Sequence, residues 1–125
     1  MKIPLILDEN QANYQIRGFE PGRIQINDAI YTASLIVAPN QLITNWPPSS
    51  VAELKKEHLD IIIPLEPTIL LIGTGSNLVF PPLNLYGHFI NLGIGVEIMH
   101  TAAASRTYNA LTAENRKVVA ALMLR

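Results

Sequence analysis

The chain has 125 residues, of which 9 are Lys or Arg, 10 are Asp or Glu, 3 are His and none is Cys. This length predicts one domain over residues 1–125, and a content of 49% hydrophobic and 15% charged residues excludes a disordered chain. A net charge of -1 without a basic run argues against a nucleic-acid partner, and the absence of Cys excludes disulfides, thiolate catalysis and Cys-based metal centres.

The hydrophobic segments predict neither export nor a membrane span. The apolar stretch Ile3–Leu7 ends at Asp8, and it is shorter than the roughly 7–15 apolar residues of a signal peptide. A spanning helix needs about 18 or more uncharged apolar residues, and Pro64, Glu66 and Pro67 interrupt the richest region. We therefore expect a soluble, cytoplasmic protein.

The first third of the chain predicts short antiparallel strands. Polar and apolar residues alternate in Tyr14–Phe19 and in Arg23–Asn27, as they do in half-buried strands. An Asn-Asp turn leads into the apolar run Ala29–Ala38, and a Pro-Asn turn leads on to Gln41–Trp46. We expect these four strands to form an antiparallel meander that ends in a hairpin.

The middle of the chain predicts a short helix and two strands that are covered on both faces. Ser50 and Glu53 match a capping box at the start of a helix that ends near Leu59. The continuous apolar runs Ile61–Ile63 and Ile69–Ile72 are typical of strands in a parallel sheet flanked by helices.

A second helix is predicted from Pro81 to Gly93, because Pro is tolerated in a first helical turn and Gly suits a left-handed helix end. Gly87 inside this helix is about 1 kcal/mol less favourable than Ala. It indicates either close packing against a neighbour or a wrong helix assignment.

The C-terminal region predicts a strand, a helix and a final strand. The strand covers Val96–Met99, and a helix begins at Thr101 and breaks at Asn115, which tolerates the left-handed end position. Lys117–Leu124 then forms a strand beside the two preceding ones.

The sequence Gly73-Thr74-Gly75 follows a buried strand, as a phosphate-binding loop does. The full dinucleotide motif is missing because position 78 is Leu78, and no P-loop lysine follows. We favour a tight turn at a strand end over a nucleotide site, and we expect no cofactor.

Neither the histidines nor the serines predict a metal or catalytic site. His58, His88 and His100 are scattered along the chain, which favours structural or surface roles over metal ligation. Ser105 lacks the strained G-x-S-x-G turn that exposes a serine nucleophile.

A polar cluster lies on the last predicted helix: Ser105, Arg106, Thr107 and Asn109. Arg106 either binds an anion or a partner, or it is buried and bonds to loop carbonyls, Glu97 or Glu114. We favour the buried, structural interpretation, because the helix must pack closely against the sheet.

Residues 73–124 resemble the domain-of-unknown-function 498 family, whose fold is the Mth-type domain. The family pattern combines G-T-G, G-I-x-x-E-x-M, R-T-Y-N and E-x-R. The matching positions are Gly73, Thr74, Gly75, Gly93, Ile94, Glu97, Met99, Thr101, Ala104, Arg106, Thr107, Tyr108, Asn109, Leu111, Glu114 and Arg116. The chain departs from the pattern at His100, Ser105 and Asn115, where the family usually has Asp, Cys and Gly.

The resemblance implies a three-layer α/β fold, with a central mixed sheet flanked by helices and an antiparallel β portion from the N-terminal half. It implies no reaction. Relatives include a mitochondrial complex I assembly factor, which acts through protein contacts, and the adipogenesis-associated Mth-domain protein.

Two functions follow as hypotheses. The first is a non-enzymatic protein-interaction or assembly-factor-like module that contacts an unidentified protein or a second copy of itself; an exposed apolar patch would fit it. The alternative is a small anionic-ligand binder or enzyme that uses a cleft between the Gly73–Gly75 turn and the helix starting near Thr101. The residues predicted for a ligand or partner site are Gly73, Thr74, Gly75, Glu97, Thr101, Arg106, Thr107 and Asn109, and none is predicted to be catalytic.

Overall fold

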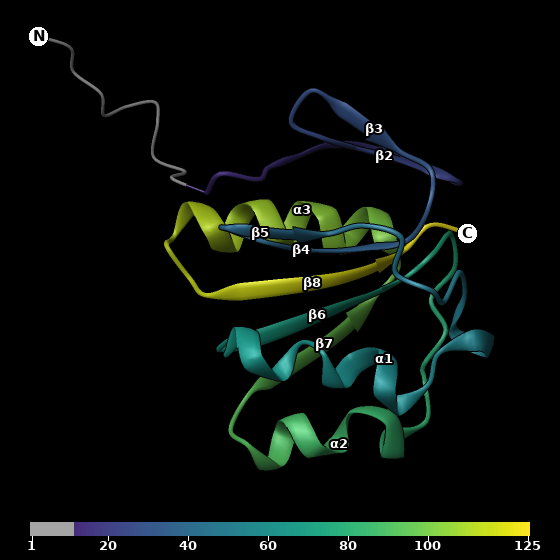
Figure 1. The fold of residues 1–125 in the computed structure, drawn as a ribbon, viewed down its shortest axis with the longest axis vertical. Helices are drawn as coiled ribbons and strands as arrows, with labels where there is room; N and C mark the ends of the chain where they lie inside the picture. Colours follow the sequence, from purple (N-terminus) through teal and green to yellow (C-terminus); the bar gives the residue numbers. More distant parts are fainter. Residues whose placement is uncertain (1–11) are drawn as a thin grey trace, which may run out of the picture.

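The computed structural model of the chain describes residues 12–125 (Figure 1). Residues 1–11, which include Ile3–Leu7, lie outside this part, so a single domain over residues 1–125 stays a prediction. The elements in chain order are β1 (Ile16–Glu20), β2 (Arg23–Ile26), β3 (Ala29–Tyr31), β4 (Leu35–Ala38), β5 (Gln41–Ile43), the 3-10 helix η1 (Val51–Glu53), α1 (Lys56–Asp60), the 3-10 helix η2 (Ile63–Leu65), β6 (Ile69–Thr74), α2 (Leu83–Asn91), β7 (Gly95–Met99), α3 (Thr101–Ala113) and β8 (Val118–Met123).

The strands form a small sheet and a large sheet. The small sheet is antiparallel with the order β1-β2-β3, and the large sheet has the order β5-β4-β8-β6-β7. In the large sheet, β4 runs antiparallel to β5 and β8, whereas β6 runs parallel to β7 and β8. The large sheet is therefore mixed, as the resemblance implies.

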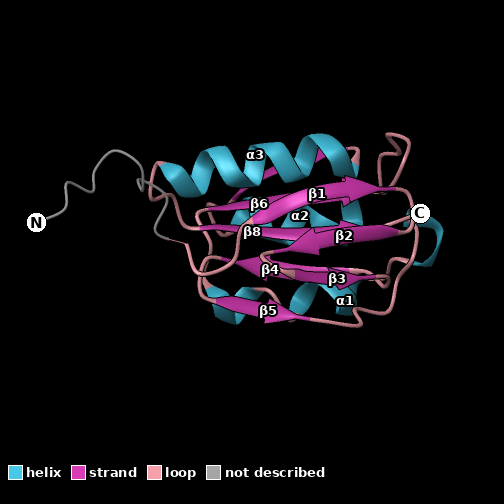
Figure 2. Cartoon of the chain, turned by 90° about the horizontal axis from the view of Figure 1, so that it is seen from above, coloured by secondary structure: helices cyan, strands magenta, loops and turns pink. Residues whose placement is uncertain are grey.

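The large sheet is the central layer of three. Figure 1 shows α3 and the small sheet on one of its faces, and α1 and α2 on the other. In Figure 2, α3 and the small sheet lie side by side over the large sheet. All residues of β6 and β8 are buried, because these central strands are covered on both faces. The predicted three-layer α/β fold is confirmed.

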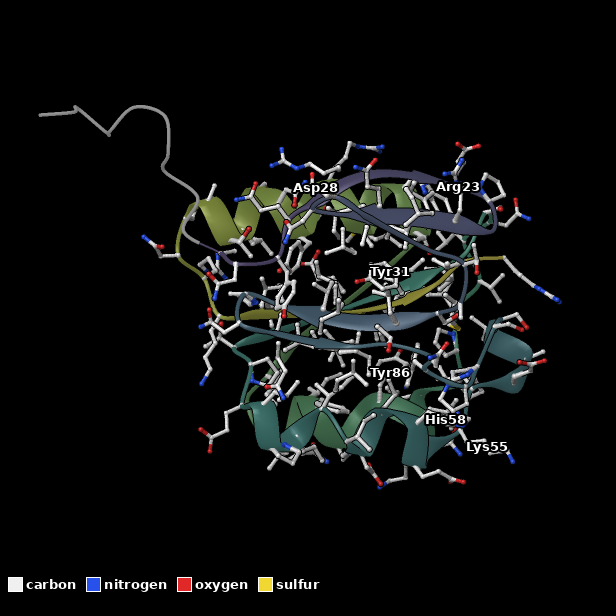
Figure 3. The ribbon with its side chains drawn as sticks, turned by 45° about the horizontal axis from the view of Figure 1, so that its top comes forward. Arg23, Asp28, Tyr31, Lys55, His58 and Tyr86 are labelled. Carbon is white, nitrogen blue, oxygen red and sulfur yellow. The ribbon has the colours of Figure 1, made fainter. Side chains whose placement is uncertain are left out.

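Each face of the large sheet contributes to its own hydrophobic core. One core packs Tyr108 of α3 and Ile24 of the small sheet against Leu71 and its neighbours, and the other packs Phe89 of α2 against Leu70 and its neighbours. Figure 3 shows Tyr31 between the two sheets and Tyr86 between the large sheet and the helices. Side chains of successive residues in a central strand point to opposite faces of the sheet, so they belong alternately to the two cores.

The predicted strand over Ala29–Ala38 is wrong in one respect, because it is two strands in different sheets. The first part, β3, is largely exposed at the edge of the small sheet, whereas all of β4 is buried in the large sheet. Residues 32–34 carry the chain from one sheet to the other. The predicted hairpin between β4 and β5 is confirmed.

Two predictions for the middle of the chain are also wrong. The run Ile61–Ile63 is not a strand, because Ile62 is buried one helical turn after Leu59, and its N–H donates to the Leu59 carbonyl. Ser50 makes no capping bond; instead the Glu53 carboxylate accepts hydrogen bonds from the backbone N–H and the hydroxyl of Ser49. These bonds lower the pKa of Glu53.

The C-terminal elements agree with the sequence predictions, except for one neighbour of the last strand. Gly93 and Asn115 have φ angles of 82° and 61°, so both end their helices in the left-handed region. Strand β8 lies between β4 and β6, so the prediction that it lies beside both preceding strands is right for β6 and wrong for β7, which pairs with β6 at the edge of the sheet.

Candidate functional site

The Gly73–Gly75 turn at the end of β6 is closed by Thr101, the first residue of α3. The Gly75 N–H donates to Thr101 Oγ1 at 2.8 Å, and the Thr101 N–H donates to the Gly75 carbonyl at 2.9 Å. The Thr101 hydroxyl in turn donates to the Met123 carbonyl at 2.6 Å. One buried hydroxyl therefore joins the ends of β6 and β8 to α3.

Both glycines of this turn are required by close packing. A Cβ on Gly73 would lie 2.9 Å from both Leu122 Cδ2 and Thr101 Oγ1. Gly75 has a φ of 95°, and a Cβ there would collide with the carbonyl oxygen of Arg125, which also accepts a hydrogen bond from the Ser76 N–H. The turn is filled by the chain itself, in agreement with the tight-turn interpretation.

Thr74 shapes the loop that follows the turn. Its hydroxyl donates to the Asn77 carbonyl at 2.6 Å and accepts from the Val79 N–H at 3.2 Å. This loop carries Leu78, Val79 and Phe80 on the surface, and Pro81 and Pro82 follow directly. Thr74 thus fixes the backbone of an exposed apolar loop.

His100 and Ser105 have structural roles in the first turns of α3. His100 is the N-cap, and its Nδ1 accepts a hydrogen bond from the Ala103 N–H at 3.2 Å. The family's usual Asp would suit the same position, because a carboxylate is a preferred N-cap group. The Ser105 hydroxyl donates to the Thr101 carbonyl and is buried, so it is not exposed as a nucleophile would be.

Tyr108 and Asn109 join α3 to the small sheet. The Tyr108 hydroxyl donates to the Tyr14 carbonyl at 2.8 Å. The Asn109 amide donates to the Ile16 carbonyl and accepts from the Ile16 N–H, as a neighbouring strand would. Burial raises the pKa of the Tyr108 phenol, because ionisation would place a charge in an apolar core.

The remaining predicted site residues do not converge on this turn. Arg106 is exposed, and within residues 12–125 its guanidinium makes no hydrogen bond or ion pair, so the expectation of a buried, structural arginine is wrong. Glu97 is exposed on the edge strand β7. The Thr107 hydroxyl contacts Met99 Sδ at 3.4 Å.

A cavity that the sequence did not predict lies at the opposite end of the large sheet. Its volume is about 790 Å³, and its lining includes Asn40, Leu65, Glu66, Arg116 and Lys117. Lys117 Nζ lies 4.0 Å from Glu66 Oε1, and Arg116 Nη1 lies 3.8 Å from Glu114 Oε1. The two cationic side chains that line the cavity, Arg116 and Lys117, therefore each have an acidic neighbour within the chain.

Residues 78–92 carry a group of exposed apolar side chains that the sequence analysis did not identify. Within this segment six large hydrophobic side chains are exposed: Leu78, Val79, Phe80, Leu83, Ile90 and Leu92. Phe80 is 67% exposed and Leu83 is 62% exposed. We call these six residues the 78–92 surface. Three consecutive apolar residues beside a Pro-Pro pair were the available sequence signal.

The described part of the chain has neither a metal site nor a spanning helix. No three His, Asp or Glu side chains of residues 12–125 come together in a way that could hold a metal ion. No helix within the same residues is long and apolar enough to cross a bilayer.

These observations define a class of protein: a three-layer α/β domain whose glycine turn and R-T-Y-N segment mainly hold the layers together. A family model described as "Protein of unknown function (DUF498/DUF598)" matches residues 16–123, and the chain belongs to this family.

Two relatives show the range of the family. The chain is 34% identical over 109 residues to the "13 kDa major membrane protein" of Francisella tularensis, covering 86% of this chain and 89% of that protein. It is 30% identical over 129 residues to a Drosophila melanogaster protein named NADH dehydrogenase [ubiquinone] 1 alpha subcomplex assembly factor 3. That match covers 98% of this chain but only 64% of the Drosophila protein.

Solved structures share the fold. A Xanthomonas campestris protein solved by NMR has a TM-score of 0.82 and 34% identity, covering 98% of this chain and 92% of that one. A Bordetella pertussis protein described as a Mth938-like domain has a TM-score of 0.81 and 28% identity, covering 99% of this chain and 92% of that one. The resemblance to the Mth-type family is confirmed.

Proposed function

We propose that this protein is a non-enzymatic protein-interaction module, similar in role to an assembly factor, and that the 78–92 surface is its contact site. The observation that carries the proposal is the concentration of exposed large apolar side chains in this one segment. Contiguous apolar surface on a soluble protein is characteristic of an interaction site.

The local structure supports binding by a preformed surface. Thr74 holds the backbone at Asn77 and Val79, and Pro81 and Pro82 restrict the chain beyond Phe80. A loop that is already ordered loses less conformational entropy when a partner binds. Apolar side chains held in this way can therefore contribute most of their burial energy to binding.

The charge distribution supports an apolar contact. From Pro67 to Val96 the sequence contains no Asp, Glu, Lys or Arg. Charged groups are depleted at the centres of protein interfaces, because they lose hydration when they are buried. The 78–92 surface lies entirely within this uncharged stretch.

The relatives agree with the proposal without establishing it. The Drosophila melanogaster and Danio rerio relatives are both named as assembly factors, and the chain spans 64% and 70% of their lengths. The alternative anionic-ligand site has weaker support, because the Gly75 N–H and the hydroxyls of Thr74 and Thr101 already bond within the chain.

A cytoplasmic location is part of the same proposal. Because the Francisella relative is named a membrane protein, fractionation of native cells is the appropriate test. We expect this protein in the cytosolic fraction at physiological salt, and recovery mainly with washed membranes would contradict that location.

The proposed contact site can be tested by site-specific photo-crosslinking in the native cell. A photoreactive phenylalanine analogue replaces Phe80, and the matched control places it at Ile30, which is also exposed but lies on β3 of the small sheet. We expect discrete protein crosslinks from position 80 and far fewer from position 30. Equal crosslinking at the two positions, or none at position 80, would overturn the proposal.

A further inference from the structure

The exposed side of α2 carries two large apolar residues on either side of a glycine. Leu83 is 62% exposed and Ile90 is 51% exposed. Positions 83, 87 and 90 are spaced four and three residues apart, so they share one face of the helix. Figure 1 shows α2 at the outside of its layer, and the exposure of both side chains means that residues 12–125 leave this face uncovered.

Nothing in the described part of the chain explains a glycine at position 87. A Cβ built there would meet only the Leu83 side chain, at an ordinary contact distance of 3.7 Å. A helix-interior glycine is less stable than alanine, and its usual benefit is close approach by a neighbouring backbone. No backbone of residues 12–125 approaches Gly87 in this way, so the close neighbour that would favour a glycine here is not supplied by the described part of the chain.

The arrangement on this face is suited to pairing with itself. If two α2 helices cross in an antiparallel manner at Gly87, Leu83 of each copy lies near Ile90 of the other. The polar residues Asn84 and Asn91 have the same seven-residue spacing on the flank of this face and would also meet each other. A twofold interface requires such self-complementarity, because the same patch forms both sides.

The distribution of charge around α2 favours a second copy of this chain as the molecule that binds the exposed face of the helix. A charged residue near a twofold axis would meet its own like charge, and the stretch from Pro67 to Val96 contains none. His88 of α2 faces inward, with Nε2 3.0 Å from Asp60 Oδ1, and Asp60 also lies 3.3 Å from Lys56 Nζ. These ionisable groups interact with each other between α1 and α2.

From the uncharged face, the flanking apolar residues and the unexplained glycine, we propose that the chain forms a twofold dimer through an antiparallel α2–α2 contact centred on Gly87. This inference rests on the proposed function, since it names a second copy of this chain as a partner of the 78–92 surface. The exposed loop Leu78–Phe80 precedes α2 in the chain and leads into the N-terminus of that helix.

Sedimentation velocity of the full chain over a dilution series tests the proposal. We expect the wild type to change from dimer to monomer on dilution, and Leu83→Asp to weaken the dimer by roughly tenfold or more. Ile30→Asp is the matched control, because it places a charge at an exposed apolar position on the opposite layer, and it should leave the dimer unchanged. A wild type that stays monomeric up to about 1 mM, or a dimer insensitive to Leu83→Asp, would overturn the proposal.

Gly87→Ala separates a specific contact from a folding defect. The monomer accommodates this Cβ without a clash, so the monomeric variant should melt no lower than the wild type. The same Cβ separates two crossing helices, so the dimer should weaken roughly tenfold. Unchanged dimerisation of Gly87→Ala would contradict a crossing at this residue. Should the chain be monomeric while position 80 still crosslinks to another protein, the dimer is excluded and the proposed function is retained.

Discussion

Thr101 and Gly75 are joined by two reciprocal hydrogen bonds, in which each backbone N–H is bound by an oxygen of the other residue. Because the same Thr101 hydroxyl also donates to the Met123 carbonyl, this pair connects the start of α3 to two central strands. The family's G-T-G motif and the Thr of its helix start are thus parts of one structural unit.

Replacing Thr101 by Val should destabilise the fold by about 2–4 kcal/mol. The shape of the side chain is preserved, but the buried Gly75 N–H and Met123 carbonyl each lose a hydrogen-bond partner. Urea unfolding measures the loss, and Thr101→Ser, which keeps the hydroxyl, is the control. Equal stability of the Val and Ser variants would show that these bonds contribute little.

Gly73→Val should be more destabilising than Thr74→Ser. The Val side chain would overlap Leu122 Cδ2 and Thr101 Oγ1, whereas Ser keeps the hydroxyl that bonds to Asn77 and Val79. Overpacking of this kind costs about 1–3 kcal/mol or more. Thermal melts of the two variants decide the order, and a smaller loss for the Val variant would refute it.

Asn115→Gly should be neutral or slightly stabilising, whereas Asn115→Val should cost about 1 kcal/mol or more. The residue has a φ of 61°, which Gly adopts freely and a β-branched side chain resists. Chemical denaturation of both variants tests this, and a Val variant as stable as the wild type would contradict it.

Stability should fall as the pH rises above about 10, where tyrosines of an unfolded chain ionise. Tyr108 stays protonated in the folded chain, because burial raises its pKa, so the unfolded state then binds fewer protons. Through Tyr108 alone, the free energy of unfolding should fall by up to about 1.4 kcal/mol per pH unit above about pH 10. Below about pH 10, Tyr108 is protonated in both states and causes no such loss.

Denaturant midpoints measured from pH 8 to about 11 test this dependence. Tyr108→Phe should be less stable than the wild type at pH 8, because the bond to the Tyr14 carbonyl is lost, but it should show a shallower decline at high pH. Tyr86→Phe retains Tyr108 and should keep the steep decline. The same decline in all three proteins would rule out a specific effect of Tyr108.

The sequence predicted the elements whose signals are local. Asn115 marked the end of α3 because a left-handed residue is needed there, and the apolar run that forms β6 marked a strand buried on both faces. The break within Ala29–Ala38 had no comparable local signal. It arises because β3 pairs with β2 whereas β4 pairs with β8, far along the chain.

The candidate site was less predictable, because its residues serve long-range contacts. Asn109 bonds to the backbone of Ile16, a contact that helix periodicity alone does not specify. The error at Arg106 was avoidable: Tyr108 faces the core, and residues two positions apart point about 200° apart around a helix. Arg106 must then face solvent.

The central claim is that this chain contacts other protein molecules, including a second copy of itself, through the 78–92 surface. A dilution series of amide nitrogen–proton NMR spectra tests it most directly, because it reports contacts residue by residue. We expect concentration-dependent shifts at residues 78–92 and constant signals in the small sheet. Shifts confined to the small sheet would contradict the claim, and the absence of shifts at residues 78–92 up to about 1 mM would contradict contact with a second copy at this surface.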